Sequence, residues 1–279
     1  MAAERLASGK GHGDENFPVA SRLIAPRHRA AIMAFYAFAR LADDIADNPA
    51  ASPAEKLALL GEMRATIEGR VDTNPQAFAL RRVCAERGLD TVHASDLLTA
   101  FERDVTTHRT ADYPALLDYC RYSAMPVGRF VLDVHGEART TWPASDALCA
   151  ALQIINHTQD CAKDLRAINR VYLPTDRMAA LGATLDDLSA PAATPALRAL
   201  VTEMAQKCLD LLRQSTRFAD LIADRRLAAE VAVIHRLAVS LTGRLLTRDP
   251  LSQRVHHTKL EAGTLALLAA AKQYLKPRR

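Results

Sequence analysis

Two acidic segments far apart in the chain carry residue types that could do chemistry. The first, LADDIAD at residues 41–47, contains Asp43, Asp44 and Asp47. Residues four apart in a helix lie side by side on one face, so Asp43 and Asp47 would present two carboxylates together. Tyr36 and Arg40 precede these acids on the same face. The segment therefore predicts a polar stripe of tyrosine, guanidinium and carboxylates.

The second segment, NHTQDCAKD at residues 156–164, repeats the spacing with Asn156, Asp160 and Asp164. Oxygen ligands without Cys or His suit Mg²⁺, which keeps several waters and bridges carboxylates to substrate phosphates. Two such stripes facing one another across a helical bundle would bind a metal-bound diphosphate. A solvated, charged helix face is the ordinary alternative for either segment alone. The apolar sequence around both favours acids that point inward or line a cleft, where a cation must offset their repulsion.

The sequence around these segments predicts an all-α protein. Residues 30–39, AAIMAFYAFA, contain no Gly or Pro, and apolar residues recur at helical spacing in later segments. Ser52-Pro53-Ala-Glu55 is typical of a helix N-terminus. Further helices are expected at 76–87, 93–109, 113–136 with an interruption at Pro126, through the second acidic segment, at 195–224 and 227–247, and at 264–274. No break in composition indicates a boundary, so we expect one domain over residues 16–279 after a flexible leader, residues 1–15.

Composition excludes several classes of function. The formal net charge is +4 and the basic residues are dispersed, which argues against a nucleic-acid surface, although anionic lipid headgroups would suit a basic exterior. The longest uncharged apolar run, about ten residues, is far shorter than the ~20 that cross a bilayer. Five cysteines without a CxxC spacing indicate reduced core residues in the cytosol. His256-His257 lacks a partner motif for a metal site, and we expect His157 and His235 to be structural.

The order of five motifs makes the chain similar to the squalene/phytoene synthase family of all-helical prenyl-diphosphate enzymes. The motifs are ENFPVAS (15–21), FYAFARLADDIAD (35–47), DYCRYSAMPVGR (118–129), LQIINHTQDCAKD (152–164) and RVYLP (170–174). ENFPVAS, Pro126, and Gln159 where most members have Arg, resemble the branch of hydroxysqualene synthases in bacterial hopanoid biosynthesis, such as HpnC. The resemblance implies a class I terpenoid synthase helical bundle with a central cavity.

The resemblance also implies roles for individual residues. The implied catalytic residues are Tyr36, Arg40, Tyr119, Tyr122 and Gln159; the substrate-binding residues are Ser21, Arg40, Ser123, Val127, Gly128, Lys163, Arg170 and Tyr172; and the metal ligands are Asp43, Asp44, Asp47, Asn156, Asp160 and Asp164. A tyrosine ring suits a carbocation pocket because its π face attracts cationic carbon. From the residues alone, core tyrosines and a Ser21 that caps a turn stay open as alternatives.

The implied reaction is the Mg²⁺-dependent conversion of presqualene diphosphate and water to hydroxysqualene and diphosphate, a lyase reaction. Roughly two or three Mg²⁺ ions and cationic side chains would stabilise the departing charge. No nicotinamide is expected, and the sequence contains no GxGxxG loop. The group that positions the water stays open among Tyr119, Tyr122, Gln159 and the released diphosphate. We hypothesise that the neutral Gln159 relaxes the grip on a second diphosphate.

Two alternatives remain at this stage. One is a transferase that condenses two farnesyl diphosphates head to head into presqualene diphosphate, squalene or a phytoene-like product. The other is a non-catalytic helical partner of a pathway enzyme. Expected partners are an isoprenoid diphosphate, other hopanoid-pathway enzymes, and a membrane if the last helix touches one rather than packing on the bundle. We expect a cytoplasmic location, with any peripheral contact at the inner face of the plasma membrane.

Overall fold

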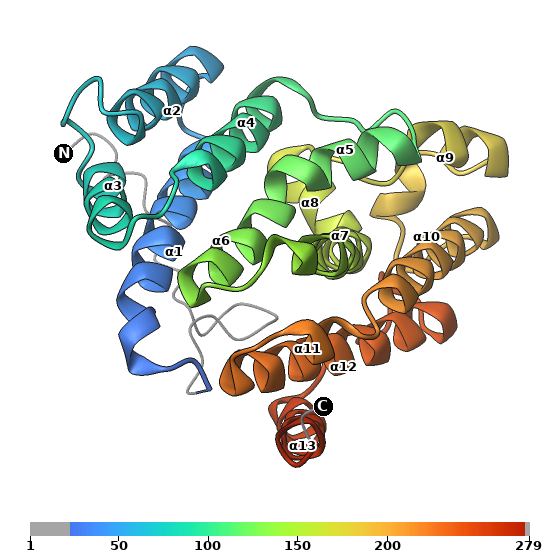
Figure 1. The fold of residues 1–279 in the computed structure, drawn as a ribbon. Helices are drawn as coiled ribbons and strands as arrows, with labels where there is room; N and C mark the ends of the chain where they lie inside the picture. Colours follow the sequence, from blue (N-terminus) through green and yellow to red (C-terminus); the bar gives the residue numbers. More distant parts are fainter. Residues whose placement is uncertain (1–22, 277–279) are drawn as a thin grey trace. The chain divides into compact units, whose positions relative to one another are not determined.

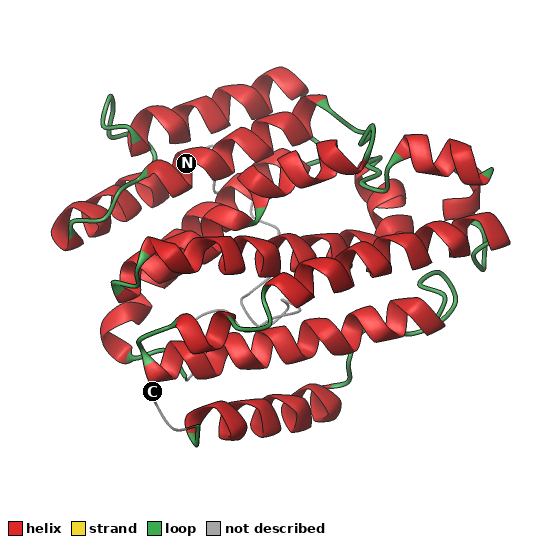
Figure 2. Ribbon diagram, turned by 45° about the vertical axis from the view of Figure 1, so that its right-hand side comes forward, coloured by secondary structure: helices red, strands yellow, loops and turns green. Residues whose placement is uncertain are grey.

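The computed structural model describes residues 23–276 as helices joined by loops (Figure 2). Within this range the β-type pairing is one isolated parallel bridge between Arg109 and Val171. The predicted all-α class is confirmed. The leader at residues 1–15 and the whole ENFPVAS motif, including the candidate Ser21, lie outside the described residues.

Contacts divide the chain into two compact units, and the prediction of a single domain over residues 16–279 stays a prediction. Unit 1 runs to Thr107 and resumes over Arg121–Ala138, while unit 2 comprises His108–Cys120 and Arg139–Arg279. Unit 1 contains α1 (Pro26–Asp47), α2 (Pro53–Ile67), α3 (Pro75–Arg87), α4 (Val92–Thr106) and α6 (Met125–His135). Unit 2 contains most of α5 (Tyr113–Ser123), then η2 (Arg139–Thr141), α7 (Trp142–Gln159), α8 (Cys161–Ile168), α9 (Thr175–Leu181), η3 (Asp186–Ser189), α10 (Pro195–Gln214), α11 (Phe218–Leu221), α12 (Arg225–Thr247) and α13 (Lys259–Tyr274).

Unit 1 is organised around α1, against which α2, α3, α4 and α6 pack (Figure 1). Phe38 and Ile45 of α1 are completely buried in its core, and Phe35 stacks on Phe130 of α6 with ring centroids 4.1 Å apart. Each large apolar side chain buried in this way stabilises the fold by about 1.5–3 kcal/mol. The predicted N-terminus of α2 is a capping box between Ser52 and Glu55. These contacts fix the helix that carries the first acidic segment.

Unit 2 is built on the packing of α7, α10 and α12 against one another. Ile155 of α7, Met204 of α10 and Ala238 of α12 have no exposed surface. Cys208 of α10 is also fully buried, and its thiol lies 3.9 Å from the Ala151 carbonyl oxygen of α7. All five cysteines are free thiols, as their spacing predicted. The core fixes the C-terminal half of α7, which leads into the second acidic segment.

The helix expected over 113–136 breaks at Ala124, two residues before the expected interruption at Pro126, and the second acidic segment is also broken. The segment 113–136 ends one helix at Ser123 and starts another at Met125, with Ala124 between them at φ −125°, ψ −45°. Pro126 occupies the first turn of α6, where its missing N–H costs nothing because that group has no intrahelical partner. The second acidic segment is also interrupted, at Asp160, which separates α7 from α8.

The last helix is longer than the segment 264–274 expected from the sequence. It begins at Lys259 rather than Thr264, because Thr258 and Glu261 form a capping box. No residue of α13 is buried, although the helix packs against α12. Its outward side carries the most exposed large apolar side chains among the described residues, with exposed fractions of 53–81%: Leu260, Leu267, Leu268, Tyr274, and Leu275 just after the helix. No helix in residues 23–276 is long and apolar enough to span a membrane.

Candidate active-site residues

The first acidic segment forms the last turns of α1 and is neutralised in part by Arg40. The Arg40 guanidinium lies 2.9 Å from an Asp43 carboxylate oxygen and 2.5 Å from an Asp44 carboxylate oxygen. The Asp44 side chain is 6% exposed, whereas the Asp43 side chain keeps 37% of its surface exposed. Asp47 and Tyr36 are half-buried on the same helix. Arg40 therefore pairs with two of the three carboxylates in this segment, those of Asp43 and Asp44.

The pKa of Asp43 reflects its burial and its charged neighbours. It is raised from 3.8 to about 7, chiefly by burial and then by the carboxylate of Asp47; Arg40 lowers it, and Asp44 and Asp104 raise it. Asp104 comes from α4 and is 95% buried. An added cation would favour the ionised form of the Asp43 carboxyl. The oxygen donors of this segment fit a divalent metal ion.

The other candidate site residues of unit 1 lie at the junction between α5 and α6. The guanidinium of Arg103 lies over the Tyr122 ring, 4.4 Å from its centroid, so one face of that ring already contacts a cation. The Ser123 hydroxyl is buried and has no hydrogen-bond partner among the described residues. Val127 is 41% exposed and Gly128 is half-buried.

The second acidic segment keeps its helical hydrogen bonds across the break at Asp160. The Asp160 amide donates to the Asn156 carbonyl at 2.9 Å, and the Asp164 amide donates to the Asp160 carbonyl at 2.8 Å. The ammonium of Lys163 lies 3.6 Å from an Asp160 carboxylate oxygen. Asp160 and Asp164 are 28% and 19% exposed. The predicted ligands of this segment thus lie along one local hydrogen-bond ladder in unit 2.

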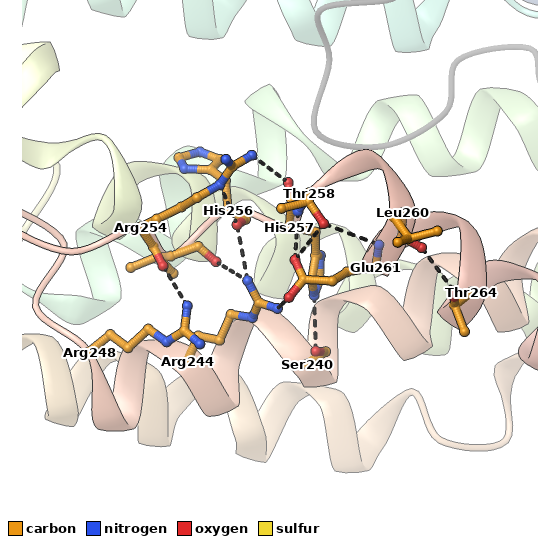
Figure 3. A network of polar contacts seen from close by, with 11 residues as sticks. Ser240, Arg244, Arg248, Arg254, His256, His257, Thr258, Leu260, Glu261 and Thr264 are labelled. Carbon is orange, nitrogen blue, oxygen red and sulfur yellow. Dashed lines mark hydrogen bonds and ion pairs between the residues drawn. The ribbon is translucent and has the colours of Figure 1, made fainter.

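Two histidines lie beside these aspartates, although the sequence indicated that both are structural or without a partner. His256 Nε2 is 3.7 Å from an Asp160 carboxylate oxygen, and His157 Nδ1 is 3.7 Å from an Asp164 carboxylate oxygen. Figure 3 shows how the segment of His256 is held: Arg244 donates to its carbonyl at 3.0 Å and to the Glu261 carboxylate at 2.9 Å. No local pattern joins His256 to an aspartate so far back in the chain, so only the fold reveals this neighbour.

The RVYLP segment is extended and is held by the segment before α5. The Val171 amide donates to the His108 carbonyl at 2.9 Å, and the Thr110 amide donates to the Val171 carbonyl at 3.1 Å. These two hydrogen bonds make the bridge between Arg109 and Val171, and the Arg109 guanidinium donates to the side-chain oxygen of Asn169 at 2.7 Å. The backbone of this segment is therefore held at two points, the amide and the carbonyl of Val171.

This segment places Tyr172 among three polar or aromatic side chains of unit 2. The Tyr172 hydroxyl is 3.5 Å from the Tyr119 hydroxyl and 3.5 Å from Nη1 of the buried Arg170. Its ring stacks on His157 with centroids 3.5 Å apart and an interplanar angle of 19°. Arg170, Tyr172 and Tyr119 thus form one connected group that also includes His157.

Gln159 is the most unusual polar residue of the second segment. It is 94% buried, and neither its amide oxygen nor its amide nitrogen has a hydrogen-bond partner among the described residues. An unsatisfied buried amide costs about 1–3 kcal/mol, so such a group is more typical of a functional site than of a core. The neighbouring Cys161 is not a nucleophile, because burial raises the pKa of its thiol to about 12.

In residues 23–276 no three side chains of His, Cys, Asp or Glu converge closely enough to hold a metal ion by themselves. Mg²⁺ commonly takes only one or two protein carboxylates and completes its shell with water and phosphate. The donor types of both acidic segments suit that mode of binding, and Arg40 supplies positive charge to the first of them.

A sequence model of squalene/phytoene synthases matches residues 10–261 of the chain. The chain belongs to the squalene/phytoene synthase family. The predicted family is confirmed, and family members process prenyl diphosphates and generally depend on divalent metals. The chain is 55% identical to the hydroxysqualene synthase of Zymomonas mobilis, covering 97% of this chain and 92% of the relative. It is 53% identical to the hydroxysqualene synthase of Rhodopseudomonas palustris, covering 93% and 89%.

Members of the family with other names are more distant. The phytoene synthase of Thermus thermophilus is 28% identical over 90% of the chain and 86% of the relative. Among solved structures, the squalene synthase HpnC of Alicyclobacillus acidocaldarius aligns over 98% of this chain and 93% of that chain, with 29% identity and a TM-score of 0.70. A dehydrosqualene synthase with a bound ligand, 22% identical, aligns over 97% and 95% with a TM-score of 0.77. The predicted terpenoid synthase helical fold is confirmed.

Proposed function

We propose that the chain is a hydroxysqualene synthase, which converts presqualene diphosphate and water into hydroxysqualene and diphosphate. One observation carries the proposal: identity of 47–55% to three relatives named hydroxysqualene synthase over at least 92% of the chain. The phytoene synthases of Mycobacterium bovis, Thermus thermophilus and Zea mays are 30%, 28% and 28% identical to the chain. We therefore infer the product, hydroxysqualene, from the relatives with which the chain shares about half of its residues.

Both acidic segments take part in the proposed reaction. Asp43, Asp44 and Asp47 in unit 1, and Asn156, Asp160 and Asp164 in unit 2, would hold Mg²⁺. When bound, Mg²⁺ supplies Lewis acidity to the diphosphate leaving group. Arg40 orients the carboxylates of Asp43 and Asp44, because its guanidinium pairs with both.

Cationic and phenolic groups of unit 2 would bind the diphosphate. Lys163 is largely exposed beside Asp160, whereas Arg170 is buried and points toward the Tyr172 hydroxyl. A buried guanidinium is pre-organised for phosphate oxygens because it loses little freedom on binding. Tyr119 and Tyr122 would present π faces to the cationic carbon skeleton after the carbon–oxygen bond breaks. Ser21, Ser123, Val127 and Gly128 complete the proposed substrate contacts.

Gln159 is the proposed residue that orients the water. Its buried amide offers one acceptor and two donors that no described side chain uses. A neutral amide also leaves less positive charge for a second diphosphate than an arginine would. Replacement by Arg is therefore expected to lower turnover of presqualene diphosphate, whereas unchanged selectivity between presqualene and farnesyl diphosphate would contradict this role.

The experiment for the whole proposal compares two substrates. The purified chain is incubated with Mg²⁺ and either presqualene diphosphate or farnesyl diphosphate, without a reductant, and products are identified by mass spectrometry. We expect hydroxysqualene from the first substrate and no consumption of the second. Consumption of farnesyl diphosphate alone would instead support head-to-head condensation.

We also propose that the exposed side of α13 contacts an anionic lipid surface. Its exposed residues Leu267 and Leu268 form the centre of an apolar stripe, and Lys259 and Lys272 flank it near the two ends of the helix. Apolar area and flanking lysines together favour a membrane interface over solvent. Leu267→Glu with Leu268→Glu should abolish cosedimentation with anionic vesicles, whereas Leu57→Glu, at an exposed leucine of unit 1, should not. Concentration-dependent dimerisation without vesicle binding would contradict this proposal.

A further inference from the structure

His157 contacts two of the proposed site residues through different parts of its ring. The ring face stacks on Tyr172 at 3.5 Å between centroids, and the ring edge places Nδ1 3.7 Å from a carboxylate oxygen of Asp164. The His157 side chain is 13% exposed, so the protein largely fixes its orientation. Tyr119 completes the aromatic group, with its ring centroid 5.9 Å from that of His157.

Gln153, one turn earlier on α7, determines which ring nitrogen carries the proton. The Gln153 amide nitrogen lies 2.9 Å from His157 Nε2. With the Gln153 amide oriented as it is in the structure, its nitrogen donates to Nε2, which assigns the proton of the neutral imidazole to Nδ1. The Nδ1–H group therefore points to the side of the ring on which Asp164 lies. At 3.7 Å the contact is longer than a hydrogen bond, so the Nδ1–H dipole acts on the carboxylate only electrostatically, and the carboxylate lone pairs stay available for a metal.

The stacked face has a separate consequence for Tyr172. This residue lies on the extended segment after α8 rather than in a helix, so packing must fix its ring. The His157 ring covers one face of Tyr172, and the Tyr172 hydroxyl lies 3.5 Å from both Arg170 Nη1 and the Tyr119 hydroxyl. Loss of the imidazole ring would free Tyr172 to move away from Arg170.

We propose that His157 is a positioning residue that couples the proposed metal ligand Asp164 to the proposed diphosphate contact Tyr172. Its Nδ1–H group orients the Asp164 carboxylate, Gln153 fixes the tautomer that makes this possible, and its ring face holds Tyr172 beside Arg170. Side chains that orient metal ligands in this way usually affect metal affinity by 10–100-fold. The inference rests on the proposed function, because it assigns the metal to Asp164.

Two substitutions at one position separate the two roles. His157→Phe keeps a ring over Tyr172 but removes the Nδ1–H group. His157→Asn replaces Nδ1–H with an amide N–H of similar reach but removes the ring. Gln153→Met leaves the imidazole in place and removes only the donor that fixes its tautomer. His235→Phe is the matched control, because His235 is a half-buried histidine of unit 2 that bonds the Leu212 carbonyl at 3.0 Å.

The first measurement is binding rather than turnover. Mn²⁺ is titrated into each full-length variant at fixed inorganic diphosphate and followed by electron paramagnetic resonance. We expect the Mn²⁺ concentration at half-saturation, the midpoint, to rise about 10-fold or more in His157→Phe. It should rise by a smaller factor in Gln153→Met and by no more than about threefold in His157→Asn. His235→Phe should match the unmodified chain. The second measurement, KM for presqualene diphosphate at saturating Mg²⁺, should rise most in His157→Asn, with kcat changed less.

The reference variant Asp164→Asn separates failure of the inference from failure of the proposed function. If Asp164→Asn raises the Mn²⁺ midpoint and His157→Phe does not, the role of His157 is wrong and the metal site stands. If Asp164→Asn leaves the midpoint unchanged, the metal assignment and the role of His157 both fail. Equal loss in His157→Phe and His157→Asn, accompanied by lower melting temperatures, would show a merely structural histidine and overturn the proposal.

Discussion

Replacement of Arg40 by Met tests whether this arginine neutralises the first acidic segment. The substitution removes the cation that contacts Asp43 and Asp44 but keeps a side chain of similar length. The Arg40 and Asp44 side chains are 19% and 6% exposed, so the pair is largely desolvated. Leaving one member of a buried pair without its partner costs about 3–5 kcal/mol. The half-exposed contact with Asp43 adds no more than about 1 kcal/mol.

The assay is urea unfolding followed by circular dichroism in EDTA, with the free energy of unfolding extrapolated to water. Arg82→Met is the matched control, because the Arg82–Glu86 pair is 3.3 Å long with side chains 68% and 62% exposed, and such pairs contribute about 0–1 kcal/mol. The double variant Arg40→Met, Asp44→Asn should recover part of the loss, since it removes the stranded charge. A cost for Arg40→Met no larger than that of Arg82→Met, or no recovery in the double variant, would refute this account of the charge balance.

Three further predictions follow from the described contacts. Asp47→Asn should reduce Mg²⁺-dependent diphosphate release at least 10-fold while the melting temperature stays within a few degrees, and full activity would remove Asp47 from the proposed ligands. Phe38→Ala should lower the free energy of unfolding by about 3–5 kcal/mol, because Phe38 has no exposed surface; a cost below about 1 kcal/mol would contradict its place in the core. The pKa of Glu261 is lowered from 4.5 to about 2 by hydrogen bonds from the Thr258 backbone, the Arg244 side chain and the Thr258 side chain. The ionised Glu261 therefore stabilises the folded chain above pH 4.5, and this contribution disappears as the pH falls toward 2. Glu261→Gln should therefore reduce stability at pH 7, and its difference from the unmodified chain in urea unfolding should shrink between pH 4.5 and pH 2; a difference independent of pH would contradict the assigned cause.

Local signals predicted the parts of the fold that depend on neighbouring residues in sequence. Ser52 and Glu55 lie at the helix N-terminus that the sequence predicted, where they form a capping box. The spacing of Asp43 and Asp47 predicted acids on one helix, and the apolar sequence around them predicted that Asp44 would be buried. These features need only a few residues, so the sequence contains enough information to predict them.

Features that depend on distant residues could not be predicted in the same way. Asp104 reaches the first acidic cluster from α4, and His256 reaches Asp160 from the loop before α13. No Gly or Pro marks the break at Asp160, so the sequence around it continues to favour a helix. The role of His157 depends on Tyr172, which reaches it through the backbone pairing of Val171 with His108. Such neighbours are set by tertiary packing, which local spacing does not encode.

The origin of the product oxygen tests the central claim most directly. The chain, Mg²⁺ and presqualene diphosphate are incubated in water enriched in oxygen-18, and the alcohol is analysed by mass spectrometry. Capture of the carbocation by water predicts hydroxysqualene that carries the heavy isotope, with one diphosphate released per alcohol formed. Presqualene diphosphate left unchanged, or an alcohol without the heavy isotope, would contradict the account.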